Sequence, residues 1–225
     1  MGGAISDLPR RWRATLNTAE SIRTGLPQAK VDFSGGSEEE LEGFLRAITP
    51  GTVAAARELV DRYDFSSCRT LADVGGGSGA LAMVIAEEYP GVRATVIDLP
   101  TVTPIARRII RESAAADRID VAPADAVAGP IPGAYDVAVL RALIQVLSPD
   151  DVVPMLRNVY AVLNPGGVVL ELKFTNSYPF WVANMLGRVE VIRRGVCKYV
   201  ICARAAGISL EPTSGSGRHR NSSEM

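Results

Sequence analysis

The chain has 225 residues, 47% hydrophobic and 22% charged, an ordinary composition for one globular α/β domain with a buried core. A formal net charge of −1 gives no electrostatic basis for binding nucleic acid or a membrane surface, and no apolar run is long enough to span a bilayer or form a secretion signal. Three cysteines cannot all pair and the single histidine lies near the C-terminus, so we expect a cytoplasmic protein without a metal site.

Residues 1–66 are predicted to be helical. A first helix covers about residues 8–22, and a second begins at the capping box Ser37-Glu-Glu-Glu40 and ends at Pro50. A third is expected over about residues 52–63. Because these helices are too few for an independent domain, we expect residues 1–66 to form a connector or lid over the main sheet.

From Arg69 onward the pattern changes to alternating strands and helices, which indicates a parallel sheet covered on both faces. The predicted fold is therefore a doubly wound, mostly parallel α/β domain at residues 67–186, preceded by the N-terminal helices. The expected strands are 70–74, 93–98, 118–123, 134–140 and 167–173, and the expected helices are 78–89, 101–116 and 149–163.

Residues 187–225 show no clean period. We expect an irregular C-terminal segment that ends in a polar tail from about Ser214, because almost nothing there is available for burial.

The first predicted strand ends in Asp73-Val-Gly-Gly-Gly-Ser-Gly79, a turn that brings backbone N–H groups and a helix N-terminus up to a ligand. Gly75-x-Gly77-x-x-Ala80 also satisfies a loose dinucleotide fingerprint, which is weak by itself. The carboxylate of Asp73 would repel a pyrophosphate but could accept hydrogen bonds from a cationic amino-acid ligand. A nucleoside-linked amino acid is therefore favoured over a dinucleotide.

Three charged residues follow the next strands at the same edge of the sheet. Asp98 lies about twenty residues beyond the turn, where a carboxylate can accept both ribose hydroxyls, although it could instead cap a turn. Asp125, followed by Ala126, is placed to accept an adenine amino group, and the alternative is a solvated loop aspartate. Arg141 could contact the ligand or remain in solvent.

Four motifs occur together and in order: the glycine turn, Ile97-Asp-Leu-Pro100, Ala124-Asp-Ala126 and Asn164-Pro-Gly-Gly167. Over roughly residues 8–175 they resemble the S-adenosylmethionine-dependent O-methyltransferases of the caffeate and hydroxyindole type, including bacterial enzymes of secondary metabolism. The resemblance implies a Rossmann-like class I methyltransferase core with S-adenosyl-L-methionine as cofactor. The cofactor contacts that it implies are Gly75, Asp98, Asp125, Ala126 and Arg141.

The resemblance also implies an acceptor that is a small aromatic or polyketide-like molecule with a hydroxyl group. Many family members have a histidine base where this chain has Gln145, which cannot accept a proton, so no catalytic residue is predicted. The family is usually homodimeric, and we expect this chain to be truncated because the resemblance starts at the connector before the catalytic domain. The alternatives are a cofactor-binding remnant without catalysis and a nucleotide-dependent oxidoreductase.

Overall fold

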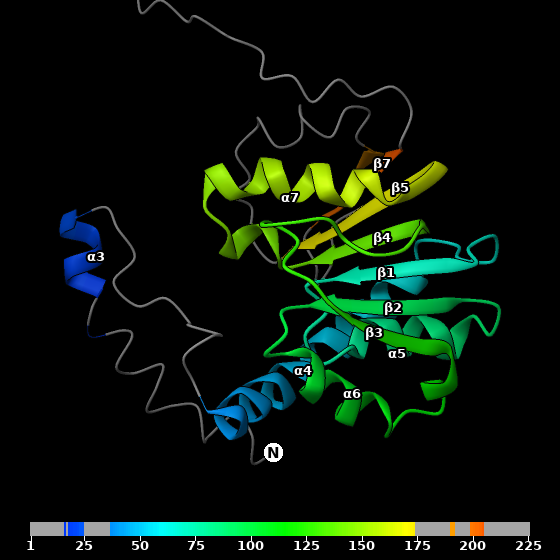
Figure 1. Cartoon of the computed structure of the whole chain (residues 1–225), viewed down its shortest axis with the longest axis horizontal. Coiled ribbons are helices and arrows are strands. Elements are labelled where there is room, and N and C mark those ends of the chain that lie inside the picture. Colours follow the sequence, from blue (N-terminus) through cyan, green and yellow to red (C-terminus); the bar gives the residue numbers. More distant parts are fainter. Residues whose placement is uncertain (1–15, 17, 25–36, 174–189, 192–198, 205–225) are drawn as a thin grey trace, which may run out of the picture.

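A computed structural model describes residues 16, 18–24, 37–173, 190–191 and 199–204 of the chain (Figure 1). The helices are α3 (Thr18–Thr24), α4 (Glu38–Val60), α5 (Ala80–Glu88), α6 (Thr103–Ile110) and α7 (Pro149–Ala161), with the short 3-10 helices η1 (Ala116–Arg118) and η2 (Ile144–Val146). The strands are β1 (Thr70–Val74), β2 (Arg93–Asp98), β3 (Ile119–Pro123), β4 (Tyr135–Arg141), β5 (Leu163–Lys173), β6 (Glu190–Val191) and β7 (Tyr199–Arg204).

All of these strands belong to one sheet with the order β3-β2-β1-β4-β5-β7-β6. The five strands from β3 to β5 are parallel, and they occur where the sequence pattern predicts strands. From β1 the chain builds the sheet outward first toward β3 and then toward β5, which confirms the doubly wound α/β fold. In a sheet of this kind the ligand lies at the carboxyl edge, where the direction of winding reverses between β1 and β4.

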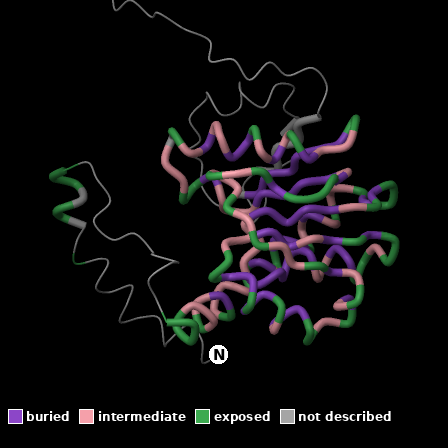
Figure 2. The backbone as a smooth tube through the Cα atoms, viewed as in Figure 1, coloured by how far each residue is buried: buried purple, intermediate pink, exposed green. Residues whose placement is uncertain are grey.

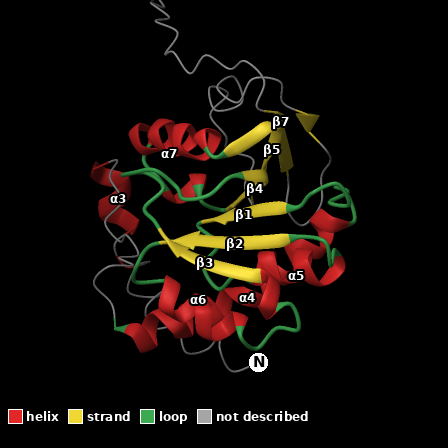
Figure 3. Cartoon of the chain, turned by 45° about the vertical axis from the view of Figure 1, so that its right-hand side comes forward, coloured by secondary structure: helices red, strands yellow, loops and turns green. Residues whose placement is uncertain are grey.

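The sheet is covered on both faces, as Figure 3 shows. Alternate residues of the strands face opposite sides, so Leu71 packs with residues of α4, α5 and α6, whereas Ala72 and Val74 pack with residues of α7. The central strands β1 and β4 are consequently buried on both faces, whereas the edge strand β3 is more exposed (Figure 2). A third, smaller apolar cluster joins α4 to α6 through Leu45, Val102, Ile105 and Ile109.

Helix α4 corrects one prediction, because it continues through Pro50 where two separate helices were expected. Proline inside a helix removes one hydrogen bond and costs about 3 kcal/mol or more. The buried face nevertheless continues across Pro50, from Leu45 to Leu59, and burial of a leucine side chain contributes about 1.5–3 kcal/mol. Packing of this face against α5 and α6 thus offsets the cost. The predicted capping box is confirmed, since Ser37 and Glu40 bond each other's backbone N–H groups.

Two expectations at the ends of the chain are only partly within the described residues. Of the helix expected at 8–22, the described part is Leu16 and the start of α3, which extends to Thr24. Strands β6 and β7 lie in the segment 187–225, which was expected to be irregular, and β7 pairs antiparallel with β5. None of the described helices is long and apolar enough to cross a membrane.

Candidate functional site

The glycine turn lies between β1 and α5, at the carboxyl edge of the sheet. Gly75, Gly77 and Gly79 have φ angles of 68°, 58° and 75°, a left-handed conformation that other residues adopt with strain. The N–H of Gly75 donates to the carbonyl of Ile97 in β2 over 2.8 Å, which ties the turn to the neighbouring strand. At Gly76 a Cβ atom would lie 2.7 Å from Cγ of Asp73, so the turn lies directly against that carboxyl group.

Asp73 is buried, with a relative exposure of 1%, and one of its oxygens has no partner. Oδ2 accepts a hydrogen bond from the N–H of Ala82 over 3.3 Å, whereas Oδ1 has no hydrogen-bond partner in the described part of the chain. Burial raises the pKa of the Asp73 carboxyl to about 7, and the charge of Asp98 adds to the effect while Ala82 and Arg141 oppose it. A cationic donor group near Oδ1 would satisfy this acceptor and favour its ionised form.

Asp98 ends β2 and reaches across to the glycine turn. Its Oδ2 accepts from the N–H of Gly77 over 2.7 Å, and its Oδ1 accepts from the N–H of Leu99 over 2.8 Å. Burial raises the pKa of this carboxyl as well. Asp98 therefore caps the turn, which was one of its two predicted roles. It can still accept hydrogen bonds from ribose hydroxyls, because each carboxylate oxygen has a second lone pair.

Asp125 and Ala126 follow β3 at the same edge. Asp125 is exposed, and its Oδ1 caps the following turn by accepting from the N–H groups of Val127 and Ala128 over 2.9 and 3.2 Å. Ala126 is half-buried, and its carbonyl accepts from Asn158 of α7 over 2.9 Å. The backbone of this loop is held from both sides, and Oδ2 of Asp125 is left to accept from a ligand.

Arg141 ends β4 and is half-buried on the side of α4. Its Nη2 lies 3.9 Å from the position that a Cβ atom would take on Gly51, in the middle of α4. Its positive charge lowers the pKa of Asp73, opposing the effect of burial. The structure thus brings Arg141 to the same edge as the predicted site, where it acts on the Asp73 carboxyl.

The residues after Arg141 turn back over the glycine turn, which the sequence did not predict. Ala142 has a φ angle of 58°, the one non-glycine residue with positive φ in the described ranges. Leu143 follows, and its Cδ1 lies 3.0 Å from where a Cβ atom on Gly75 would be. Gln145 lies in η2 and is exposed to solvent. The sequence signal that could have indicated Leu143 is its position, since it is an apolar residue two positions beyond the end of a strand at the ligand edge.

The described residues contain no group of three or more His, Cys, Asp or Glu side chains that could hold a metal ion. Within the described residues, the site instead combines a turn with three left-handed glycines, a buried acceptor without a partner, a carboxylate at the end of β2 and another just after β3. An adenosyl amino acid has the donors that match these acceptors: an amine, two ribose hydroxyls and an adenine amino group.

A family model for the O-methyltransferase domain matches residues 24–175, which is more than half of the chain and includes the whole candidate site. The chain belongs to the O-methyltransferase family. The family resemblance drawn from the motifs is therefore confirmed, and the sheet with its flanking helices is the class I methyltransferase fold.

The curated relatives of this chain include two Streptomyces enzymes. The mitomycin biosynthesis 6-O-methyltransferase of Streptomyces lavendulae is 30% identical over 173 residues, which cover 73% of this chain and 49% of that protein. The aclacinomycin 10-hydroxylase of Streptomyces purpurascens is 37% identical over 179 residues, which cover 76% of this chain and 47% of that protein. The chain thus spans about half the length of the curated relatives it matches.

Among solved structures, an O-methyltransferase from neocarzinostatin biosynthesis has the same fold, with a TM-score of 0.75 and 19% identity. The alignment covers 87% of this chain and 69% of that one, and that protein was solved in complex with S-adenosyl-L-homocysteine and 1,4-dihydroxy-2-naphthoic acid.

Proposed function

We propose that this chain binds S-adenosylmethionine at the glycine turn and transfers a methyl group to a hydroxyl of a small aromatic or polyketide-like metabolite. The observation that carries the proposal is the Asp73 carboxyl, buried against a turn with left-handed glycines and with Oδ1 lacking a partner. A buried acceptor without a partner is costly unless a ligand donor satisfies it. Several relatives are named as O-methyltransferases of such metabolites, and these names support the proposed class of acceptor.

Each carboxylate at these strand ends would bind a different part of the ligand. Asp73, near the end of β1, would accept from the amine of the methionine part, and Asp98, the last residue of β2, would accept from the ribose hydroxyls. Asp125, after β3, would accept from the adenine amino group, and Ala126 would lie beside the ring. Because β1, β2 and β3 are neighbours in the sheet, this order places the ligand along the carboxyl edge.

The bound cofactor would supply a methyl group made electrophilic by the positive charge on its sulfonium sulfur. The chain's own contribution is orientation, since Gln145 can hold an acceptor hydroxyl by hydrogen bonding but cannot take its proton. Correct placement of two reactants can by itself supply several kcal/mol of the barrier reduction. We therefore propose that methyl transfer here relies on proximity without a side-chain base, and that the proton of the acceptor hydroxyl passes to water.

A second candidate function is binding of the cofactor without methyl transfer. Two observations favour it: Gln145 stands where many family members have the histidine base, and one relative at 37% identity is named as a hydroxylase. Membership of the family therefore does not by itself identify the reaction.

Incubation with S-adenosylmethionine and a panel of phenolic and hydroxynaphthoate acceptors, followed by mass spectrometry, separates these candidates. The proposal predicts a product heavier by one methylene unit, formed together with S-adenosylhomocysteine. Cofactor binding without any product would favour the second candidate, and a product heavier by one oxygen atom would point to hydroxylation. Absence of cofactor binding at millimolar concentration would overturn both candidates.

A further inference from the structure

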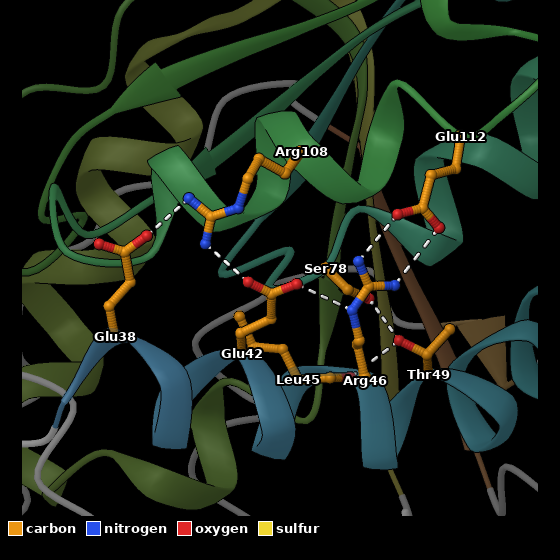
Figure 4. A network of polar contacts seen from close by, with 8 residues as sticks. All are labelled: Glu38, Glu42, Leu45, Arg46, Thr49, Ser78, Arg108 and Glu112. Carbon is orange, nitrogen blue, oxygen red and sulfur yellow. Dashed lines mark hydrogen bonds and ion pairs between the residues drawn. The ribbon is translucent and has the colours of Figure 1, made fainter.

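Helix α4 makes a direct polar contact with the glycine turn, between residues 29 positions apart in the sequence. The Thr49 hydroxyl oxygen lies 2.9 Å from Oγ of Ser78 and 2.8 Å from the carbonyl oxygen of Leu45, one turn earlier in the same helix (Figure 4). Thr49 has one hydroxyl proton, and the carbonyl of Leu45 can only accept. Thr49 therefore donates to Leu45, and Ser78 donates to Thr49.

Removing the acceptor at Thr49 would leave a buried donor, because Ser78 has a relative exposure of 3%. The neighbouring residue of the turn also lies close to α4, since Cδ2 of Leu45 is 3.3 Å from where a Cβ atom on Gly77 would be. Gly77 is in turn the residue whose N–H donates to Asp98 over 2.7 Å. One face of α4 thus lies against two consecutive residues of the turn, Gly77 and Ser78. Of these, Gly77 is bonded to Asp98, the carboxylate assigned to the ribose.

The same helix is held against α6, which begins five residues after Asp98. Arg46 bonds Glu42 of its own helix and Glu112 beyond the end of α6, with distances of 2.9 and 2.8 Å. Arg108 of α6 bonds Glu38 and Glu42 of α4, each at 2.6 Å. Figure 4 shows these ion pairs running along α4 beside the Thr49–Ser78 contact. Helix α4 is therefore fixed relative to both the turn and the element that follows Asp98.

We propose that Thr49 is a positioning residue of the cofactor site: acting through Ser78, it holds the glycine turn in the shape in which the Gly77 N–H meets the Asp98 carboxylate. This inference rests on the proposed function, because it names how that site keeps its shape. It assigns to α4, which lies before the glycine turn in sequence, a role in ligand affinity.

The test compares two isosteric substitutions on the same helix. Thr49→Val removes the hydroxyl that reaches Ser78, whereas Thr52→Val removes a hydroxyl that bonds the carbonyl of Ile48 in its own helix over 3.2 Å. Loss of one hydrogen bond to a buried group shifts a conformational equilibrium by roughly five- to tenfold. Binding weakens by up to this factor when the freed turn leaves its binding shape in the ligand-free protein. We expect this loss in the dissociation constant of Thr49→Val for S-adenosylmethionine, measured by calorimetry, and the wild-type value for Thr52→Val. Thr49→Ser, which keeps the hydroxyl, should restore affinity.

A second readout needs no ligand. Amide hydrogen exchange at Gly77 and Ser78 should be faster in ligand-free Thr49→Val than in wild type, and unchanged in Thr52→Val. In combination with Ser78→Ala, Thr49→Val should add no further loss of affinity, because either change removes the same bond.

Equal weakening of binding by Thr49→Val and Thr52→Val would overturn the inference, since it would reduce the effect to general stability of α4. Wild-type affinity in Thr49→Val, or additive losses with Ser78→Ala, would also overturn it. If wild-type protein fails to bind S-adenosylmethionine, the proposed function falls, and unchanged exchange at Gly77 would then separately refute the contact's role in holding the turn.

Discussion

The buried carboxyl of Asp73 predicts that affinity for S-adenosylmethionine depends on pH. In the ligand-free protein burial raises the pKa of Asp73 to about 7, so the carboxyl is roughly one tenth ionised at pH 6 and about half ionised at pH 7. A ligand amine binds the ionised form. If Asp73 must be ionised in the complex, affinity should rise about fivefold between pH 6 and pH 7, with release of a proton on binding.

Calorimetry in buffers of different ionisation enthalpy measures both quantities, the dissociation constant and the number of protons released. Asp73→Asn keeps the shape of the side chain but cannot titrate, so it should bind weakly and lose most of the pH dependence. The dependence that remains belongs to Asp98, whose pKa burial also raises. An unchanged pH profile in Asp73→Asn, or binding to wild type without proton release at pH 6, would refute the assignment of Asp73 to the ligand amine.

The raised pKa of Asp73 also determines whether the stability of the ligand-free protein rises or falls with pH. The pKa of Asp73 is higher in the folded protein, about 7, than in the unfolded chain, about 3.9, so between these values the folded state holds a proton that the unfolded state has released. The ligand-free protein should therefore lose stability from this group as pH rises from about 4 to about 7, by on the order of a few kcal/mol. Urea unfolding of wild type and Asp73→Asn across this range measures the difference.

Two further predictions concern the fold that carries the site. Gly79→Ala should lower the free energy of unfolding in urea by about 1–3 kcal/mol, because φ is 75° and the new Cβ would lie 2.7 Å from Cδ1 of Ile110. Gly43→Ala in α4 is the matched control, since nothing lies within 4 Å and alanine should raise stability by about 0.5–1 kcal/mol; equal effects would contradict the geometry. Ser37→Ala removes the capping box of α4 and should cost about 1 kcal/mol, and no change in thermal unfolding would mean that the cap is unimportant.

Much of the fold was predictable because its signals are local. The parallel strands are short apolar runs bounded by turns, and each one was expected where it occurs. The carboxyl ends of neighbouring parallel strands meet at one edge, so the sequence positions of Gly75, Asp98 and Asp125 were enough to bring them together. The structure confirms that these three residues lie at the ends of adjacent strands.

What the sequence did not predict depends on contacts between distant segments. Pro50 marked the end of a helix by its local chemistry, but the buried face of α4 continues past it because α5 and α6 pack against that face. The Thr49–Ser78 contact and the approach of Leu143 to Gly75 have no local signature, since each joins residues from different elements. Strand β7 has an antiparallel partner in β5 that a period of two does not reveal.

Calorimetric titration of the wild-type chain and of Asp98→Asn tests whether the carboxyl edge of this sheet is a site for S-adenosylmethionine. We expect saturable binding to wild type and about tenfold or greater loss in Asp98→Asn, because the negative charge that strengthens the hydrogen bond to a ribose hydroxyl is removed. Asp117→Asn, at an exposed carboxylate in η1, should bind like wild type. Wild-type affinity in Asp98→Asn, or no binding to the wild-type chain, would contradict the assignment of this edge to S-adenosylmethionine.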